Sequence, residues 1–301
     1  LAPTDAGGLR VDALERMLRE EGLRPRLVYT VPAHANPTGA TMPATRRARL
    51  AALAREFKFW VLADEAYHAL HWSDETQPPR MATYDWRYAP EGSGDAQEDL
   101  AAGGLVSVGS MSKVLSPACR VGLLEAVPPL VRAMHARGYI DSGGGPVYLA
   151  SEIVAEALAS GDVARNLASL RAAYKARCAT LCAALEAAAP KFRFQKPVGG
   201  YFVFVRLPEG CPDADALLPY AAEEGVRFLP GTACSATAVV VSPAAADAGS
   251  AAAAPPAPAP PQEAADADDS QALGRHIRLC FALLGEEEIC EAVDPPSAGG
   301  G

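Results

Sequence analysis

The sequence contains no Cys-x-x-Cys pair. Its 7 cysteines are spread along 301 residues, and their odd number argues against a fully paired disulfide framework. Cys178 and Cys182 stand one helical turn apart, but no histidine or carboxylate joins them at ligand spacing. We therefore expect these cysteines in a protein core, a reducing compartment, and no bound metal.

Long apolar runs are absent as well. No uninterrupted apolar stretch is long enough to cross a bilayer, and the first residues do not resemble a signal peptide. We expect no membrane partner and, by default, a cytoplasmic protein. Because the chain starts at Leu1 and not at Met, an organelle-targeting segment further upstream stays open.

Positive charge is scarce, with 27 Lys and Arg against 36 Asp and Glu and a formal net charge of -9. Nucleic-acid binding needs clustered Lys and Arg that release counterions from phosphates, so we expect no nucleic-acid partner. Half of the residues are hydrophobic, and the length allows one large or two modest domains. These properties fit a globular enzyme with small-molecule partners.

Apolar residues in the first half of the chain alternate between helical and strand-like spacing. This alternation predicts an α/β fold with a largely parallel sheet, whose active groups lie just after the strands. The predicted elements are a helix at residues 9–21, a strand at 26–31, a helix from 43, and strands at 59–63, 105–109 and 121–124.

The second half begins with two long helical patterns, at residues 147–158 and 163–185, broken by Ser-Gly-Asp at 160–162. We place a domain boundary here, with a large domain at 1–165 and a small α+β domain at 166–301. The small domain is predicted to contain strands at 201–205 and 276–281 and a helix at 213–224.

Three segments are poor in large apolar side chains. Residues 243–272 consist mainly of Ala, Pro, Asp and Gly, and we predict a disordered surface insertion there. Residues 92–104 are expected to form a smaller insertion of the same kind, and residues 295–301 a loose tail.

Four polar elements follow predicted strands: Asn-Pro-Thr-Gly at 36–39, Asp-Glu-Ala-Tyr at 64–67, Ser-Met-Ser-Lys at 110–113, and Arg120. Each alone could be only a turn, a helix cap or a polar loop. Together, in this order and spacing, they resemble the class I/II aminotransferases of pyridoxal-5'-phosphate (PLP) fold type I. The resemblance extends to Pro-Val-Gly-Gly-Tyr-Phe at 197–202 and Arg-Leu-Cys-Phe at 278–281, and is strongest to the branch of 2-aminoadipate aminotransferases.

The resemblance implies a three-layer α/β/α large domain that lacks its amino end, followed by the small α+β domain. It also implies PLP as the cofactor, amino acid and 2-oxo acid substrates, and a homodimer when the protein is complete. The expected reaction is a ping-pong transfer of an amino group from an L-amino acid, such as 2-aminoadipate or an aromatic or branched-chain amino acid, to a 2-oxo acid such as 2-oxoglutarate.

By the same resemblance, Lys113 bonds to the PLP aldehyde and Asp64 keeps the pyridine nitrogen protonated. Asn36 and Tyr67 match the positions that hydrogen-bond the cofactor phenolate oxygen, with Asn36 also close to the substrate. The alternatives are an exposed loop lysine for Lys113, a helix N-cap for Asp64, a turn residue for Asn36 and a helix aromatic for Tyr67.

Ser110 and Arg120 match ligands of the cofactor phosphate, because a hydroxyl and a guanidinium suit a dianion. A surface arginine without a partner is the alternative for Arg120. Arg278 matches the arginine that binds the substrate α-carboxylate in a two-pronged pair. Arg275 lies nearby, but only Arg278 stands in the Arg-Leu-x-Phe context.

Complete members of this family carry a further N-terminal region with a phosphate-binding helix end and an aromatic that stacks on the cofactor ring. We expect the cofactor site of residues 1–301 to be incomplete without it. Two rival functions stay open: a PLP-dependent lyase of the C-S β-lyase type on the same fold, and a non-catalytic relative that acts as a binding protein.

Overall fold

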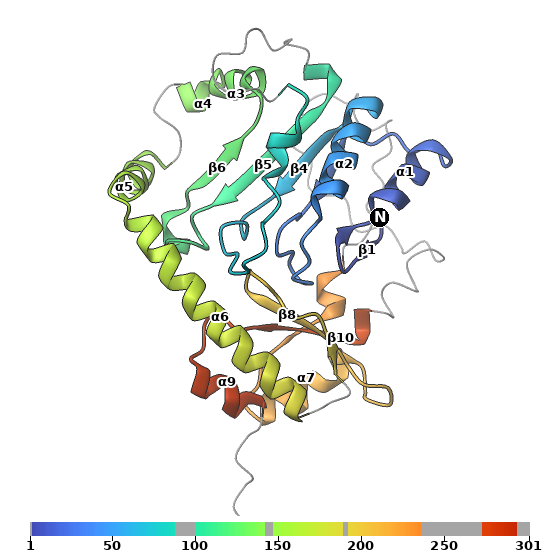
Figure 1. The fold of residues 1–301 in the computed structure, drawn as a ribbon, viewed down its shortest axis with the longest axis vertical. Coiled ribbons are helices and arrows are strands. Elements are labelled where there is room, and N and C mark those ends of the chain that lie inside the picture. Colours follow the sequence, from blue (N-terminus) through green and yellow to red (C-terminus); the bar gives the residue numbers. More distant parts are fainter. Residues whose placement is uncertain (1, 88–99, 142–146, 189–191, 236–272, 294–301) are drawn as a thin grey trace, which may run out of the picture.

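The computed structural model describes residues 2–87, 100–141, 147–188, 192–235 and 273–293. Two four-stranded sheets lie one above the other in Figure 1, and the long helix α6 (Asp162–Ala188) runs down beside both. The segments predicted as disordered at 243–272 and 295–301 lie outside the described residues.

The first sheet has the strand order β3 (Leu27–Thr30), β4 (Trp60–Asp64), β5 (Gly104–Ser110) and β6 (Gly122–Glu125). The first three strands are parallel, and β6 is antiparallel to β5. This difference follows from the connections, because a short loop can join antiparallel neighbours, whereas parallel strands need a crossover. The sheet confirms the predicted α/β class.

Helices α1 (Val11–Arg19) and α2 (Ala44–Phe57) cover one face of this sheet. The apolar positions of α2 recur at helical spacing, and Leu50 and Leu53 are fully buried against the sheet. On the opposite face Tyr29 is 58% exposed, so the described residues cover this side less completely.

The second sheet has the order β7 (Arg193–Phe194), β8 (Phe202–Arg206), β10 (His276–Cys280) and β9 (Leu229–Pro230), with antiparallel neighbours. Helices α7 (Ala214–Glu223) and α9 (Glu286–Val293) accompany it. The predicted strands and helix of the small unit are thereby confirmed.

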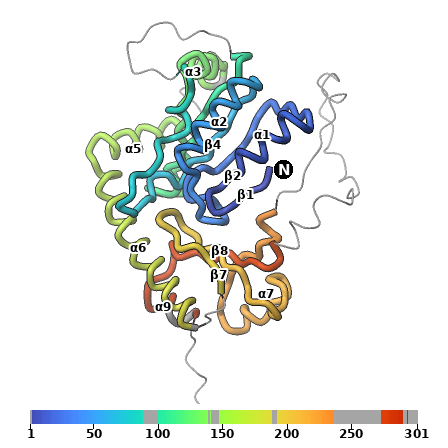
Figure 2. Tube along the Cα trace, turned by 45° about the vertical axis from the view of Figure 1, so that its right-hand side comes forward, coloured from blue at the N-terminus to red at the C-terminus, as the bar shows by residue number. Residues whose placement is uncertain are grey.

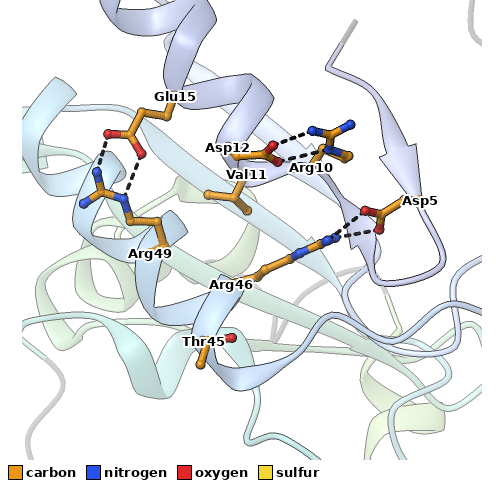
Figure 3. A pocket seen from close by; sticks show the side chains of 8 residues that line it. All are labelled: Asp5, Arg10, Val11, Asp12, Glu15, Thr45, Arg46 and Arg49. Atoms are coloured by element: carbon orange, nitrogen blue, oxygen red, sulfur yellow. Dashed lines mark hydrogen bonds and ion pairs between the residues drawn. The ribbon is translucent and has the colours of Figure 1, made fainter.

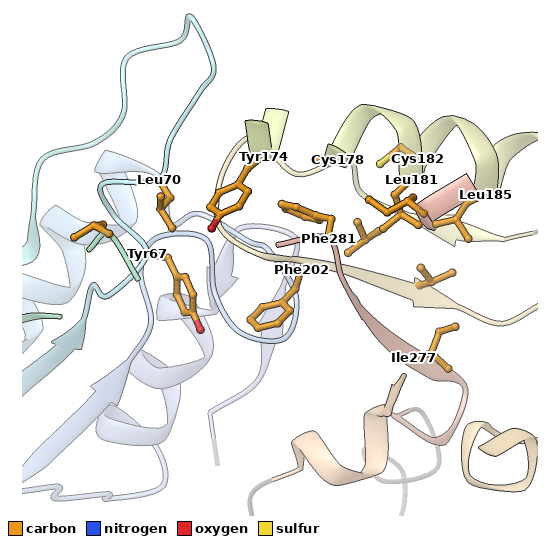
Figure 4. Close-up of a cluster of buried hydrophobic side chains, with 14 of the residues drawn as sticks. Tyr67, Leu70, Tyr174, Cys178, Leu181, Cys182, Leu185, Phe202, Ile277 and Phe281 are labelled. Atoms are coloured by element: carbon orange, nitrogen blue, oxygen red, sulfur yellow. The ribbon is translucent and has the colours of Figure 1, made fainter. Parts of the chain in front are cut away.

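A single apolar cluster joins α6 to the second sheet and reaches the loop after β4. Figure 4 shows Cys178, Leu181 and Cys182 of α6 near Phe281, with Tyr67 on the other side of the cluster. Both cysteines are buried, as expected from the sequence. The cluster therefore connects the first sheet to the second.

The remaining elements are short, apart from α5 (Tyr148–Ala159), which precedes α6 in Figure 2. They are β1 (Thr4–Asp5), β2 (Gly8–Leu9), α3 (Pro128–His135), α4 (Gly138–Asp141) and 3-10 turns at Met81–Tyr84, Leu100–Ala102, Pro117–Cys119 and Gly231–Cys234. None of the helices in the described part of the chain is long and apolar enough to span a membrane.

One boundary of the sequence prediction is wrong. Residues 92–104 were expected to form an insertion, of which 92–99 lie outside the described residues; Leu100–Ala102 is a 3-10 turn, and Gly104 begins β5 beside Trp60. The glycines stand here because a Cβ at Gly103 would lie 2.3 Å from the Phe59 carbonyl oxygen. The proposed domain boundary at 165/166 falls within the continuous helix α6 and stays a prediction.

Candidate active site

Three predicted site residues follow adjacent parallel strands of the first sheet. Asp64 ends β4, Ser110 ends β5, and Asn36 stands in the turn that follows β3. Since the carboxyl ends of parallel strands meet at one edge of a sheet, all three residues lie at that edge. The sequence order of the motifs therefore corresponds to one place in the fold.

The Asp64 carboxylate is held by two hydrogen bonds. Its Oδ2 accepts from the Tyr29 hydroxyl at 2.9 Å, and its Oδ1 accepts from the Ala66 backbone N–H at 3.2 Å. Burial, followed by the bond to Asp64, raises the pKa of Tyr29 to about 12, so this hydroxyl keeps its proton. Residues 66–69 form a turn and not a helix, so Asp64 closes a local turn and is no helix cap.

Lys113 lies in the loop after β5 and is half-buried. Its Nζ is 5.7 Å from the centroid of the Tyr67 ring and 5.6 Å from that of Tyr201. Tyr67 itself is buried, and this burial raises its pKa. Within the described part of the chain no carboxylate forms an ion pair with Lys113, and the rings of Tyr67 and Tyr201 lie beside its amine.

Ser110 and Arg120 are brought near each other by the pairing of β5 with β6. Ser110 lies opposite Gly122, and the Met111 N–H donates to the Val121 carbonyl at 3.0 Å. Arg120 is exposed, and its guanidinium donates to the Pro117 carbonyl at 3.2 Å. The fold thus returns Arg120 to the end of β5 that carries Ser110.

Arg278 connects the second sheet to the edge of the first. Its guanidinium donates to Asn36 Oδ1 at 2.7 Å and lies 4.2 Å from the centroid of the Phe202 ring. Arg278 Nε is buried and has no hydrogen-bond partner among the described residues. Arg275, by contrast, is occupied by the backbone carbonyls of Pro208 and Cys211.

Two histidines contact each other beside the turn that carries Asn36. His34 is stacked on His71 with ring centroids 5.3 Å apart, and burial lowers the pKa of His34 to about 3. No cluster of three or more potential metal ligands occurs in the residues that the structure describes. His34 is therefore a neutral core residue beside the Asn36 turn.

Sequence reasoning missed three aromatic neighbours of the site: Tyr29, Tyr201 and Phe202. Tyr201 and Phe202 belong to the Pro-Val-Gly-Gly-Tyr-Phe motif, which was noticed without assigning them a role. Tyr29 lies opposite Leu62 in the sheet, and Leu62 and Asp64 are two residues apart on the same face of β4. Asp64 is therefore the diagonal neighbour of Tyr29, within reach of its long side chain.

A separate hollow lies between α1 and the first turns of α2, on the covered side of the first sheet (Figure 3). Its arginines are already paired, Arg46 with Asp5 and Arg49 with Glu15. This hollow lacks the residues of the strand-end site and presents balanced charge to solvent.

Residues 1–248 match the aminotransferase class I and II family. Among curated proteins, the aromatic-amino-acid aminotransferase 1 of Thermococcus litoralis is 32% identical over 237 residues, which is 77% of this chain and 52% of that protein. The 2-aminoadipate transaminase of Thermus thermophilus is 30% identical over 231 residues, covering 76% of this chain and 53% of that protein. The chain therefore belongs to the class I and II aminotransferases.

The solved structures agree with this family. The α-aminoadipate aminotransferase of Thermus thermophilus, complexed with N-(5'-phosphopyridoxyl)-L-leucine, superposes with a TM-score of 0.69 at 27% identity, over 97% of this chain and 62% of that one. The chain spans about half the length of the curated relatives it matches. HTH-type transcriptional regulators also match, among them TauR of Rhodobacter capsulatus, 31% identical over 77% of this chain and 44% of that protein.

Proposed function

We propose that this protein is a PLP-dependent aminotransferase that moves the amino group of an L-amino acid to a 2-oxo acid. The observation that carries the proposal is the meeting of Lys113, Asp64 and the Arg278–Asn36 pair at one edge of the sheet. The side chains at this edge suit the chemical groups of PLP. They offer a carboxylate for the ring nitrogen, an amine for the aldehyde, and a hydroxyl with a guanidinium for the phosphate. Arg278 Nε is buried without a hydrogen-bond partner in the part of the chain that the structure describes, which supports a further ligand beside it.

Bound PLP supplies an aldehyde that bonds to amines and a ring that accepts electrons from the substrate α-carbon. In this proposal Lys113 holds the cofactor and carries a proton to or from the α-carbon. Asp64 keeps a proton on the ring nitrogen, and its fixed bond from Tyr29 orients the carboxylate for this task. The hydroxyl of Tyr67 donates to the phenolate oxygen of the cofactor.

The other roles concern anchoring. Ser110 and Arg120 would bind the cofactor phosphate, for which Arg120 would exchange its bond to the Pro117 carbonyl. Asn36 and Arg278 bind the substrate, with the guanidinium paired to the α-carboxylate. Stacking on Phe202 limits the directions in which that guanidinium can point.

For substrates we propose 2-aminoadipate, aromatic or branched-chain amino acids as donors and 2-oxoglutarate as acceptor, in a ping-pong cycle. The names of the two curated relatives support the first two donor classes. A second copy of the chain is the proposed partner, and the exposed apolar side chains of α5 support such a contact, with Leu149 75% and Ile153 58% exposed.

Covalent labelling tests the cofactor site. After incubation with PLP and reduction with borohydride, peptide mapping should find the label on Lys113. Lys113→Arg should remove the label, whereas Lys58→Arg, at an exposed position after α2, should keep it. Label on another lysine, or none in the folded protein, contradicts the assignment.

Product analysis tests the reaction. Transfer from 2-aminoadipate to 2-oxoglutarate without release of ammonia supports the aminotransferase. Release of ammonia and pyruvate from a cysteine conjugate supports the lyase instead. The similarity to HTH-type transcriptional regulators favours one further candidate, a ligand-binding protein, which would bind PLP and amino acids without forming product.

A further inference from the structure

Tyr201 contacts Lys113 at two points. Its hydroxyl donates a hydrogen bond of 2.9 Å to the Lys113 backbone carbonyl, and its ring centroid lies 5.6 Å from Lys113 Nζ. Among the described residues, no other side chain is seen to touch both the backbone and the amine of this lysine. Tyr201 therefore restricts the loop and the side chain together.

Tyr201 is itself fixed by aromatic neighbours from two other segments. The rings of Tyr67 and Tyr174 meet it edge-on, with centroids 5.4 and 5.3 Å away. Burial, and then a hydrogen bond with Tyr174, raise the pKa of the Tyr201 hydroxyl, so it keeps the proton that it donates to Lys113. The Tyr201 hydroxyl is thus an oriented, protonated donor that faces the Lys113 carbonyl.

The backbone on each side of Tyr201 is also fixed. Gly200 has a φ of 78°, in the left-handed region, and its N–H donates to the Leu70 carbonyl at 3.0 Å. The Tyr201 carbonyl accepts from the Phe281 N–H at 3.2 Å. The position of the ring is thus also set by backbone contacts with the segments that follow β4 and β10.

A second side chain holds the next carbonyl of the same loop. Asn166 of α6 donates from Nδ2 to the Val114 carbonyl at 2.7 Å. The consecutive carbonyls of Lys113 and Val114 are therefore both held by residues far away in the sequence. Such bonds oppose rotation of the peptide units that aim the lysine side chain.

We propose that Tyr201 is a positioning residue: its hydroxyl presets the Lys113 loop, and its ring lies with that of Tyr67 beside the amine. Asn166 supports the same loop at Val114. The inference rests on the proposed function only in naming Lys113 as the reacting amine. The hydroxyl acts through the backbone and the ring acts on the side chain, so Tyr201→Phe separates the two contributions.

The test compares Tyr201→Phe with Tyr174→Phe, which also removes a buried hydroxyl from the same cluster but touches Tyr201 and not Lys113. In cofactor-free protein, Lys113 and the exposed Lys175 are labelled with limiting acetic anhydride, and the ratio of the two labels is measured by mass spectrometry. Loss of one hydrogen bond should raise the Lys113 share about fivefold in Tyr201→Phe and leave it unchanged in Tyr174→Phe.

A second measurement follows the rate at which PLP is captured on Lys113, fixed at each time point by borohydride. Tyr201→Phe should slow capture about fivefold, because the amine is no longer preset. If the parent protein captures no PLP at Lys113, the proposed function fails, while the anhydride ratio still tests the positioning role. The inference is overturned if the ratio of Lys113 label to Lys175 label is unchanged in Tyr201→Phe. It is also overturned if Tyr174→Phe changes this ratio equally while both variants have the same free energy of unfolding in urea.

Discussion

Acidification from pH 6.5 to pH 5 should destabilise the fold through His34. This ring is 1% exposed and stacked on His71, and burial holds its pKa near 3 against an ordinary value of 6.5. The unfolded chain therefore takes up a proton that the folded chain refuses. The stability contributed by neutral His34 is complete above pH 6.5 and is lost progressively as the pH falls toward 3.

The magnitude follows from the width of that window. A shift of one pKa unit corresponds to about 1.4 kcal/mol, so the free energy of unfolding should fall by about 2 kcal/mol between pH 6.5 and 5 through His34 alone. His68, whose pKa burial lowers to about 4, acts in the same direction. Carboxylates with lowered pKa, such as Glu15, act only below their ordinary value of 4.5 and so lie outside this window.

Urea unfolding at a series of pH values, followed by circular dichroism, measures the effect. His34→Gln removes the titrating ring. Below pH 6.5 the free energy of unfolding of this variant should fall with decreasing pH less steeply than that of the parent, by about 1.4 kcal/mol per pH unit. His135→Gln serves as the control, because His135 is exposed on α3. Parallel pH curves for the parent and His34→Gln would refute the reasoning.

Three further predictions concern catalysis, binding and packing. Asp64→Asn should retain PLP but slow exchange of the substrate α-proton, seen by NMR in heavy water, at least about a hundredfold, and near-normal exchange would exclude the role. Arg278→Ala should raise the KM for amino and 2-oxo acids about tenfold to a hundredfold with little change in PLP affinity, and a lost cofactor with unchanged KM would contradict it. Leu53→Ala, at a fully buried position, should lower the free energy of unfolding by about 2–5 kcal/mol in urea, whereas Leu283→Ala, 85% exposed, should cost little.

The sequence predicted those helices and strands that local apolar spacing determines. The apolar spacing from Pro43 predicted a helix, and α2 forms there with Leu50 and Leu53 on its buried face. Gly103 and Gly104 show where this reasoning failed. A close approach of two backbones requires glycine there, and glycine-rich composition is also typical of a loop.

The site could be predicted as far as the strand order places it. Asn36, Asp64 and Ser110 each follow a parallel strand, so their shared edge was predictable once the sheet was. The contact of Arg278 with Asn36 joins residues 242 positions apart, and only the family resemblance pointed to Arg278. Tyr201 belongs to the motif at 197–202 that carried part of the resemblance, but no role was assigned to it, because its contact with the Lys113 carbonyl depends on how the second sheet docks.

The buried ion pair of Arg47 and Glu65 explains how two neighbouring carboxylates take different tasks. Glu65 follows Asp64 directly, yet its side chain points to the covered face of the sheet and meets Arg47 at 3.2 Å, with both side chains fully buried. Arg47 also donates to the carbonyl of Pro32, at 2.7 Å, just before the turn that carries Asn36. Arg47 on α2 thus shares Glu65 with Arg80 and ties the ends of β3 and β4 together. Removing Arg47 would leave the buried Glu65 carboxylate with only the longer, 3.4 Å contact to Arg80 as an ion pair, so the requirement for a folded interior also fixes the strand ends that carry Asn36 and Asp64.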